Sequence, residues 1–166
     1  WSGTRLTEMS AHEEFKISAE VLCTDRVAAS WENVLHVHTG TNRENFGDRY
    51  FTIWKQGGMS DGIRIVAPAF DNPQYELNAY VNCAPGWHTF TVQQSKTEDN
   101  NLNLEIFFDE VVVESQVVDK SATYSGPLFV DVANNFQWPA AFDHHVRNFY
   151  HQDISCSDPC FGKENC

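Results

Sequence analysis

Alternation between apolar and polar residues, repeated in short segments along most of the chain, limits this sequence to a narrow set of folds. Segment 15–23 shows the pattern, because every second side chain there is apolar: Phe15, Ile17, Ala19 and Val21. A period of two residues places alternate side chains on opposite faces of a β-strand. The segment is therefore predicted to be a strand with one face in a core.

Ten segments are predicted to be strands on this basis: 15–23, 33–38, 49–55, 62–68, 74–82, 87–94, 101–108, 111–118, 127–133 and 146–154. Most are separated by short runs of turn-forming Gly, Pro, Asn and Asp, and no segment has a convincing helical period. The sequence FFDEVVV predicts a hairpin that turns at Asp109–Glu110. The chain is therefore predicted to be all-β, with two stacked antiparallel sheets.

Size and charge narrow the classes of function. The 166 residues suffice for one domain with a real core. Acidic residues outnumber basic ones 23 to 11, a net charge of -12, which argues against nucleic-acid binding and against adsorption to anionic membranes. No apolar run approaches the roughly 20 residues of a membrane span. The balance fits a soluble secreted protein, or one that takes up cations.

The five cysteines favour disulfides over zinc: Cys23, Cys83, Cys156, Cys160 and Cys166. No CxxC pair and no finger-like pairing with histidine is present, so structural zinc is not expected. Disulfides predict a secreted, extracellular protein. Cys23 and Cys83 each end a strand-like segment and could pair. The tail would then hold one bridge and one odd thiol, which suggests a disulfide-linked oligomer or a lost partner domain.

Several motifs together carry a family resemblance. They are W-x-NVLHV at 31–37, the G-x-N…GDR loop at 40–49, WHTFTVQQ at 87–94, LNLEIFFDE at 102–110, VDVA at 130–133 and VRNF at 146–149. Over roughly residues 12–154 the chain resembles the laminin-G-like branch of the concanavalin A-like lectin and glucanase sandwiches, as found in extracellular invertebrate proteins. The resemblance implies a jelly-roll of two antiparallel sheets. It also implies binding to glycans, matrix or partner proteins, often through a calcium ion on one rim.

The C-terminal sequence CSDPCFGKENC differs from the rest of the chain in composition, because it is short, rich in cysteine and contains Pro and Gly. Its C-x3-C-x5-C spacing resembles the opening half of an EGF-like module, with three of the six cysteines that such a module needs. The predicted organisation is therefore a β-sandwich over residues 1–154, followed by a cysteine-rich tail over 155–166.

The loop between the second and third predicted strands is a candidate calcium site. Calcium takes six to eight oxygen ligands at a flexible rim. Asp48, Asn42 and Asn45 could supply several, with Glu44 and loop carbonyls, and further oxygens could come from Asp71, Asn72 or Asp143. The alternative is a structural turn, in which Arg49 pairs with a carboxylate and Gly47 and Asn42 adopt positive φ.

Two histidines form a candidate transition-metal pair. His36 and His38 lie two residues apart on a predicted strand and so share one face. A metal would need a third ligand, for which the other histidines are the candidates: His88, His144, His145 and His151. The alternative is a mildly polar face turned towards solvent.

Aromatic residues next to amides suggest where a sugar would bind. In NNFQWP, at 134–139, Trp138 could stack on a sugar ring while Asn134, Asn135 and Gln137 bind hydroxyl groups. Other tryptophans, including Trp31, Trp54 and Trp87, are interpreted as core anchors.

Catalysis has weaker support in the sequence than binding. Glu105 and Asp109 could form the carboxylate pair of a glycoside hydrolase, although the glucanase pattern alternates more tightly and Asp109 falls in the predicted turn. No serine-nucleophile or phosphate-loop motif is present. The predicted function is a secreted, non-enzymatic recognition or adhesion module for a glycan or an extracellular protein. The alternative is a structural extracellular protein that assembles through its cysteine tail.

Overall fold

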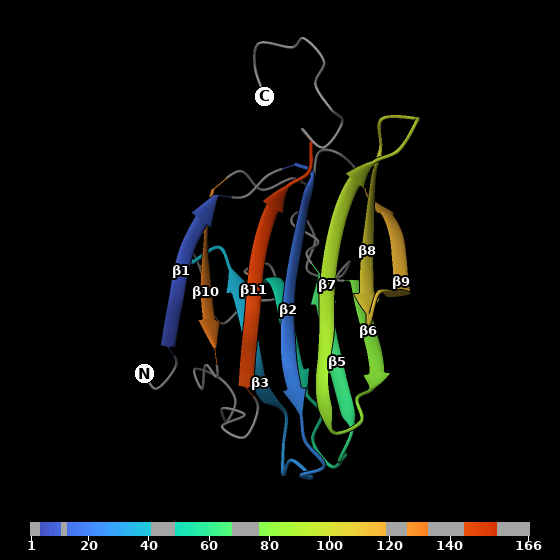
Figure 1. The fold of residues 1–166 in the computed structure, drawn as a ribbon. Helices are drawn as coiled ribbons and strands as arrows, with labels where there is room; N and C mark the ends of the chain where they lie inside the picture. Colours follow the sequence, from blue (N-terminus) through green and yellow to red (C-terminus); the bar gives the residue numbers. More distant parts are fainter. Residues whose placement is uncertain are drawn as a thin grey trace.

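The structure is a computed structural model that describes residues 4–10, 13–40, 49–67, 77–118, 126–132 and 145–155, with only the backbone described for 4–10 and 118. The described residues form eleven strands (Figure 1). These are β1 (Thr4–Ser10), β2 (Phe15–Cys23), β3 (Glu32–His38), β4 (Arg49–Lys55), β5 (Gly62–Ala67), β6 (Leu77–Asn82), β7 (Gly86–Lys96), β8 (Leu102–Phe108), β9 (Val111–Val118), β10 (Pro127–Val132) and β11 (His145–Asp153). No helix in these parts of the chain is long and apolar enough to cross a membrane.

The strands pair into two antiparallel sheets that pack face to face (Figure 1). One sheet has the order β1-β10-β3-β4-β5-β6, and the other has the order β11-β2-β7-β8-β9. All ten predicted strands are present with small shifts at their ends, so the predicted all-β, two-sheet antiparallel architecture is confirmed. The additional strand β1 was not predicted, because its sequence TRLTEMS has too few apolar residues to alternate clearly.

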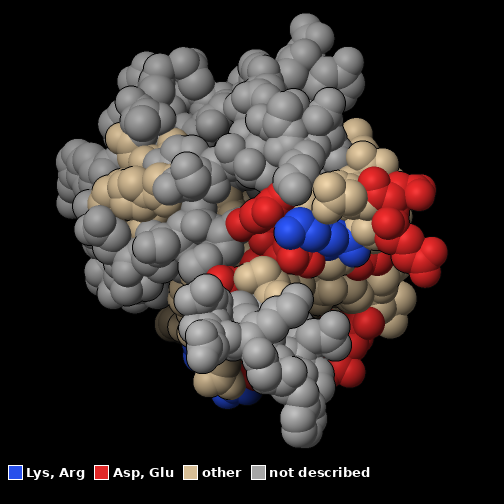
Figure 2. All heavy atoms as spheres, turned by 90° about the horizontal axis from the view of Figure 1, so that it is seen from above, with Lys and Arg blue, Asp and Glu red and all other residues tan. Residues whose placement is uncertain are grey.

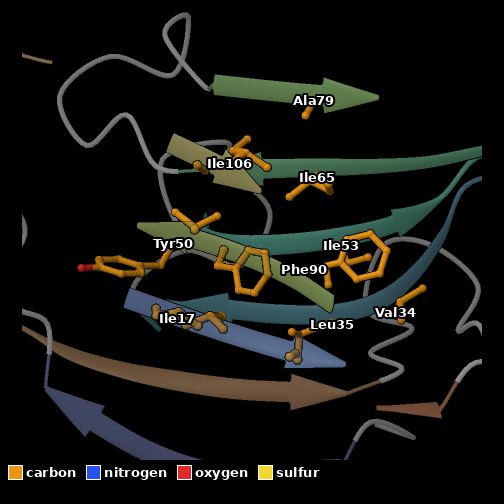
Figure 3. Close-up of a cluster of buried hydrophobic side chains, with 14 of the residues drawn as sticks. Ile17, Val34, Leu35, Tyr50, Ile53, Ile65, Ala79, Phe90 and Ile106 are labelled. Atoms are coloured by element: carbon orange, nitrogen blue, oxygen red, sulfur yellow. The ribbon is translucent and has the colours of Figure 1, made fainter. Parts of the chain in front are cut away.

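The core lies between the sheets and contains the apolar faces that the sequence predicts. Phe15, Ile17, Ala19 and Val21 of β2 are fully buried, as are Leu102, Leu104 and Ile106 of β8. Figure 3 shows Ile17, Phe90 and Ile106 of one sheet facing Leu35, Ile53 and Ile65 of the other. Burying a side chain of this size contributes about 1.5–3 kcal/mol, so this layer is the main source of the fold's stability.

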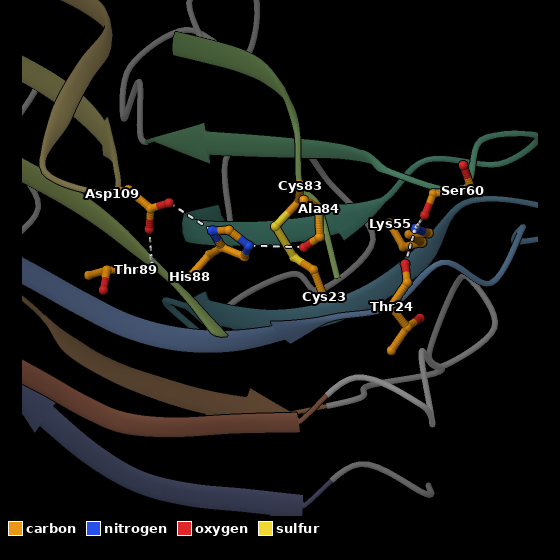
Figure 4. The surroundings of a disulfide bond; sticks show 9 residues. All are labelled: Cys23, Thr24, Lys55, Ser60, Cys83, Ala84, His88, Thr89 and Asp109. Atoms are coloured by element: carbon orange, nitrogen blue, oxygen red, sulfur yellow. Dashed lines mark hydrogen bonds and ion pairs between the residues drawn. A yellow bond between two sulfur atoms is a disulfide. The ribbon is translucent and has the colours of Figure 1, made fainter. Parts of the chain in front are cut away.

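A disulfide joins the two sheets at one end of the core. Cys23 ends β2, Cys83 follows β6, and the structure joins them across a sequence separation of 60 residues (Figure 4). Closing a loop of this length in the unfolded chain stabilises the fold by about 4 kcal/mol in the chain-entropy description. Nearby, the buried Lys55 ammonium donates hydrogen bonds to the carbonyls of Thr24 and Ser60.

The predicted turn between β8 and β9 is confirmed at Asp109–Glu110. Both residues have positive φ, 48° and 67°. The Asp109 carboxylate accepts the Thr89 N–H at 2.9 Å, and its other oxygen lies 2.7 Å from His88 Nδ1. His88 Nε2 lies 2.9 Å from the Ala84 carbonyl, so this histidine links the turn to the segment beside the disulfide (Figure 4).

Acidic side chains gather at the end of the sandwich where the β7–β8 turn lies (Figure 2). Lys96, at the end of β7, lies among them: its Nζ is 3.4 Å from Glu13 Oε2 and 3.5 Å from Glu14 Oε2. The hydrogen bond to Glu13 raises the pKa of the Lys96 ammonium above its ordinary value, with a further contribution from the charge of Glu13. The excess of acidic residues in the sequence is thus visible as a local surface charge.

Candidate functional site

The six-stranded sheet has two different faces. Its inward face contributes apolar residues to the core, and its outward face carries mainly polar and aromatic residues. Core residues of β3, β4 and β5 alternate with these side chains, and strand geometry directs alternate residues to opposite faces. We call this surface the outer face and define it by twelve residues. They are Asn33, His36 and His38 of β3, Arg49, Thr52 and Trp54 of β4, Arg64 and Val66 of β5, Asn78 and Tyr80 of β6, and Phe129 and Asp131 of β10.

Strand register aligns part of the outer face into two rows. In the first, Asn33 pairs with Trp54, Trp54 with Arg64, and Arg64 with Tyr80, across β3 to β6. The second row runs beside it and comprises Asp131, His36, Thr52, Val66 and Asn78. Directly paired side chains on one face lie about 4.5–5.5 Å apart at Cβ, so each row is a continuous strip.

Burial changes steeply along the first row. Asn33 is 2% exposed and Trp54 6%, whereas Tyr80, on the edge strand β6, is 62% exposed. Arg64 and Asn78 are partly exposed and lie between these extremes. The outer face therefore has a buried end at β3 and β4 and an accessible end at β6.

The accessible end is held in place by stacking and hydrogen bonds. The Arg64 guanidinium lies 6.0 Å from the ring centroid of Tyr80 and 6.0 Å from that of Trp31. Arg64 Nε donates to Asn78 Oδ1 at 2.8 Å. Cations over aromatic faces contribute about 0.5–1 kcal/mol at exposed sites, so this arrangement fixes a cation and two aromatic rings together.

The buried end contains hydrogen-bonding atoms that the protein does not use. Both side-chain polar atoms of Asn33, Oγ1 of Thr52 and Nε1 of Trp54 are buried and have no hydrogen-bond partner among the described residues. An unsatisfied buried polar group costs about 1–3 kcal/mol, and such groups are few in native structures. These unpaired polar atoms lie together at the buried end of the outer face.

The two histidines of the outer face are buried, so the interpretation of a solvent-facing pair was wrong. His38 is fully buried and His36 is 7% exposed, and their ring centroids lie 5.0 Å apart. The Gly40 N–H donates to His38 Nδ1 at 3.1 Å. Nδ1 is therefore an acceptor, which leaves Nε2–H to donate to Asp131 Oδ2 at 3.1 Å. His38 thus has a structural role in cross-linking β3 to β10.

Gly40 is required for that contact. Its φ is +81°, and a Cβ at this position would lie 2.5 Å from the Phe129 ring. Any other residue would combine backbone strain with a steric clash. The glycine therefore lets the backbone approach the imidazole closely.

A transition-metal site at His36 and His38 stays a prediction. Within the described ranges, no group of three or more His, Cys, Asp and Glu side chains is arranged to hold a metal ion. His88 lies on β7, and His145 and His151 lie on β11, all in the other sheet. His144 lies outside the described residues.

Other predicted site residues also lie outside the described residues. These are Asn42, Asn45, Asp48 and Glu44 of the calcium loop, Asp71, Asn72 and Asp143 as additional ligands, Asn134, Asn135, Gln137 and Trp138 of the sugar loop, and Cys156, Cys160 and Cys166 of the tail. Their roles stay predictions. Of the predicted disulfide cysteines, Cys23 and Cys83 are joined to each other.

The carboxylate pair that would make a hydrolase is not assembled. Glu105 lies in the middle of β8, opposite Gln93 and Ser115. Asp109 lies in the turn four residues later and binds His88 and the Thr89 N–H. Four strand residues span about 13 Å, beyond the roughly 5–9.5 Å that separates catalytic carboxylates in glycosidases.

Trp87 was predicted to be a core anchor, and this was wrong, because its side chain is exposed on the five-stranded sheet. The Arg147 guanidinium lies 3.8 Å from the Trp87 ring centroid, and Arg147 Nε donates to Glu20 Oε2 at 2.6 Å. Asn148, at positive φ, donates to the other Glu20 oxygen at 2.9 Å. The hydrogen bonds from Asn148 and then from Arg147 lower the pKa of the Glu20 carboxyl.

The composition of β3 to β6 carries a signal for the outer face that alternation alone does not reveal. In β3 to β6 most residues between core positions are amides, hydroxyls, aromatics, histidines or arginines, and none is lysine or glutamate. Asn33, Thr52, Trp54, Arg64 and Tyr80 all follow this pattern. Recognising them as one surface required the strand order, which periodicity does not contain.

No protein-family model matches the chain, and no curated protein matches its sequence. Solved structures do match its fold. A non-specific endo-β-1,3(4)-glucanase of family GH16 has a TM-score of 0.54 at 11% identity, covering 86% of this chain and 59% of that one. The binding domain of botulinum neurotoxin serotype C1 has a TM-score of 0.51 at 13% identity, covering 86% and 33%.

Sheep galectin-11, in a complex with glycerol, has a TM-score of 0.50 at 10% identity, covering 88% of this chain and 95% of that one. This chain therefore spans about the whole galectin, 59% of the glucanase and 33% of the toxin domain. At such low identities the likeness concerns the fold alone. The fold is a jelly-roll β-sandwich of the lectin and glucanase type, and the predicted jelly-roll is confirmed at this level.

Proposed function

We propose that this chain is a carbohydrate-binding module and that the outer face of its six-stranded sheet is the binding surface. The observation that carries the proposal is the first row, where the unused polar atoms of Asn33 and Trp54 continue into Arg64 and the exposed Tyr80. Sugar sites combine aromatic faces for C–H contacts with a few fixed hydrogen-bonding groups. The accessible end of the outer face, at Arg64, Asn78 and Tyr80, offers both kinds of group side by side.

The disulfide and the net charge of the chain support an extracellular recognition role. The Cys23–Cys83 disulfide suits a secreted protein, since disulfides persist in oxidising compartments. The net charge of -12 suits a soluble module that avoids nucleic acid. We include in the proposal a calcium ion bound by Asn42, Asn45 and Asp48, which follow β3 and precede β4.

The test is a glycan array probed with the chain and with two matched variants. Tyr80→Ala removes the exposed aromatic at the accessible end of the outer face, and Tyr150→Ala removes an exposed tyrosine from the other sheet. We expect Tyr80→Ala to weaken glycan binding by roughly five- to tenfold, the effect of losing one aromatic contact. Tyr150→Ala is expected to bind as the wild type does.

Two results would overturn the proposal. One is the absence of binding to any glycan by a folded chain, with and without added calcium. The other is glycan binding that Tyr150→Ala weakens and Tyr80→Ala leaves unchanged, which would move the site to the five-stranded sheet.

A further inference from the structure

Strand β9 exposes more apolar surface than a strand at the edge of a sheet normally does. Its first three valines are 65%, 45% and 36% exposed, and Val117 is 59% exposed. All described side chains of β9, from Val111 to Val117, are exposed on both faces of the strand. Scattered apolar residues are common on protein surfaces, but a contiguous group marks an interaction site.

The backbone of β9 has one side available for pairing. β9 is the last strand in the order β11-β2-β7-β8-β9, and among the described strands it pairs with β8 alone. Figure 1 shows it at the margin of the five-stranded sheet, on the side where β6 ends the other sheet. An edge strand presents a row of N–H and C=O groups that can accept a further strand.

Protection of this edge is limited. Edge strands are usually guarded by lysine, proline or a β-bulge, and β9, with the sequence VVVESQVV, contains neither of the first two. The register shifts at Val113, between the pairs Ile106–Glu114 and Phe107–Val112. Pairing is regular again from Glu114 to Val118. The bulge therefore leaves a short stretch suited to a short partner strand rather than to an extended stack.

Charge indicates which partner would fit. The β8–β9 hairpin carries four carboxylates, Glu105, Asp109, Glu110 and Glu114, and no basic residue. Glu114 points to the same face as Ile106, its pairing partner, so a strand added beside it would place a side chain opposite this carboxylate. A second copy of the chain would bring like charges together, because each copy has a net charge of -12.

We propose that β9 binds, as an added strand, an extended segment of a partner protein in which β-branched or aromatic residues alternate with Lys or Arg. Backbone hydrogen bonds to the edge would provide affinity, as in other cases of strand addition. The exposed Val117 and the Glu114 carboxylate would select apolar and basic side chains on alternate faces. This surface is separate from the outer face of the other sheet.

The test uses a fluorescent synthetic peptide of alternating valine and lysine, and the same peptide with N-methyl groups on alternate backbone nitrogens. Fluorescence anisotropy is measured with the wild type and three variants. Val117→Lys places a charge on the edge, and Val27→Lys is its matched control, because Val27 is equally exposed but lies outside β9. Glu114→Lys reverses the selecting charge. Sedimentation of the wild type alone reports self-association.

We expect the peptide to bind the wild type, to bind Val117→Lys about two- to fivefold more weakly, and to bind Val27→Lys as it binds the wild type. Glu114→Lys should lower the affinity for the valine–lysine peptide and raise the affinity for a peptide that has glutamate in place of lysine. Equal binding of the N-methylated peptide would overturn the proposal, since charge alone would then explain binding. Equal effects of Val117→Lys and Val27→Lys on peptide affinity would also overturn the proposal. So would a wild-type dimer that Val117→Lys dissociates, because β9 would then bind a second copy of the chain.

Discussion

Asn33, Thr52 and Trp54 show at the residue scale that the six-stranded sheet buries polar atoms without pairing them. Their side-chain polar atoms are buried without partners in the described parts of the molecule, although a valine or leucine at each position would remove that cost. Burying them therefore lowers the stability of the sheet. A single substitution can test whether these atoms are unpaired.

Thr52→Val replaces the buried hydroxyl by a methyl group of nearly the same shape. Because this fully buried hydroxyl has no partner, we expect the free energy of unfolding to stay unchanged or to rise by up to about 1 kcal/mol. Urea denaturation measures the effect. A loss of stability above about 1 kcal/mol would contradict the assignment, since it would mean that the hydroxyl is satisfied.

Glu20, on the five-stranded sheet, makes a contact whose contribution to stability should depend on pH. The hydrogen bond from Asn148, and then that from Arg147, lower the pKa of its carboxyl. The folded state therefore favours the carboxylate, and the stability from this contact is present above the ordinary pKa of glutamate. It is lost as pH falls through the lowered pKa.

Asn148→Gly removes the amide but tolerates the positive φ of this position. We expect the pKa of Glu20 to rise towards its ordinary value in this variant, and to rise in Arg147→Met for the same reason. A carbon-detected NMR titration of the Glu20 carboxyl measures the change. An unchanged titration in both variants would show that these two contacts do not set the pKa.

At the scale of single elements, the sequence predicted most of the fold because alternation is a local property. β2 and β8 have clean alternation and were predicted with nearly correct ends, whereas β1 has a polar sequence and was missed. The His36–His38 face was misjudged for a related reason. Alternation tells which residues share a face, but which face is covered depends on neighbouring elements that no local pattern describes.

The β8–β9 turn should become more stable when glycine replaces its second residue. Two-residue hairpin turns with positive φ at both positions favour glycine at the second, which Glu110 occupies here with φ 67°. Glu110→Gly should therefore raise the free energy of unfolding by about 0.5–1 kcal/mol. Glu98→Gly, in the β7–β8 turn where φ at this residue is not positive, is the matched control and should give no gain. Equal effects of the two changes in urea denaturation would contradict the argument.

On the scale of the whole molecule, the candidate site was less predictable from the sequence than the fold. Trp54, Arg64 and Tyr80 come from three strands, and their alignment follows from the pairings β4–β5 and β5–β6. The sequence identified candidate chemistry in loops, at Asp48 and Trp138, because polar and aromatic runs are conspicuous there. A site built across strands has no contiguous motif, so it becomes visible only when the sheet order is known.

The Cys23–Cys83 disulfide acts on the whole molecule because it connects the two sheets. Replacing both cysteines by alanine should lower the free energy of unfolding by about 2–4 kcal/mol, mainly because the unfolded chain regains the entropy of a long loop. Urea denaturation of the double variant measures the loss, with single-step unfolding as the control for an intact fold. A change below about 1 kcal/mol would mean that the bridge does not constrain the unfolded chain.

The most direct test of the carbohydrate-binding claim is amide chemical-shift mapping of the isotopically labelled chain titrated with an oligosaccharide from the array. We predict that the largest shifts fall on β4, β5 and β6, including Trp54 Nε1–H, Arg64 and Tyr80, with little change on β2, β7 and β11. Shifts centred on Trp87, Arg147 and Tyr150 would place the sugar on the opposite sheet and contradict the account.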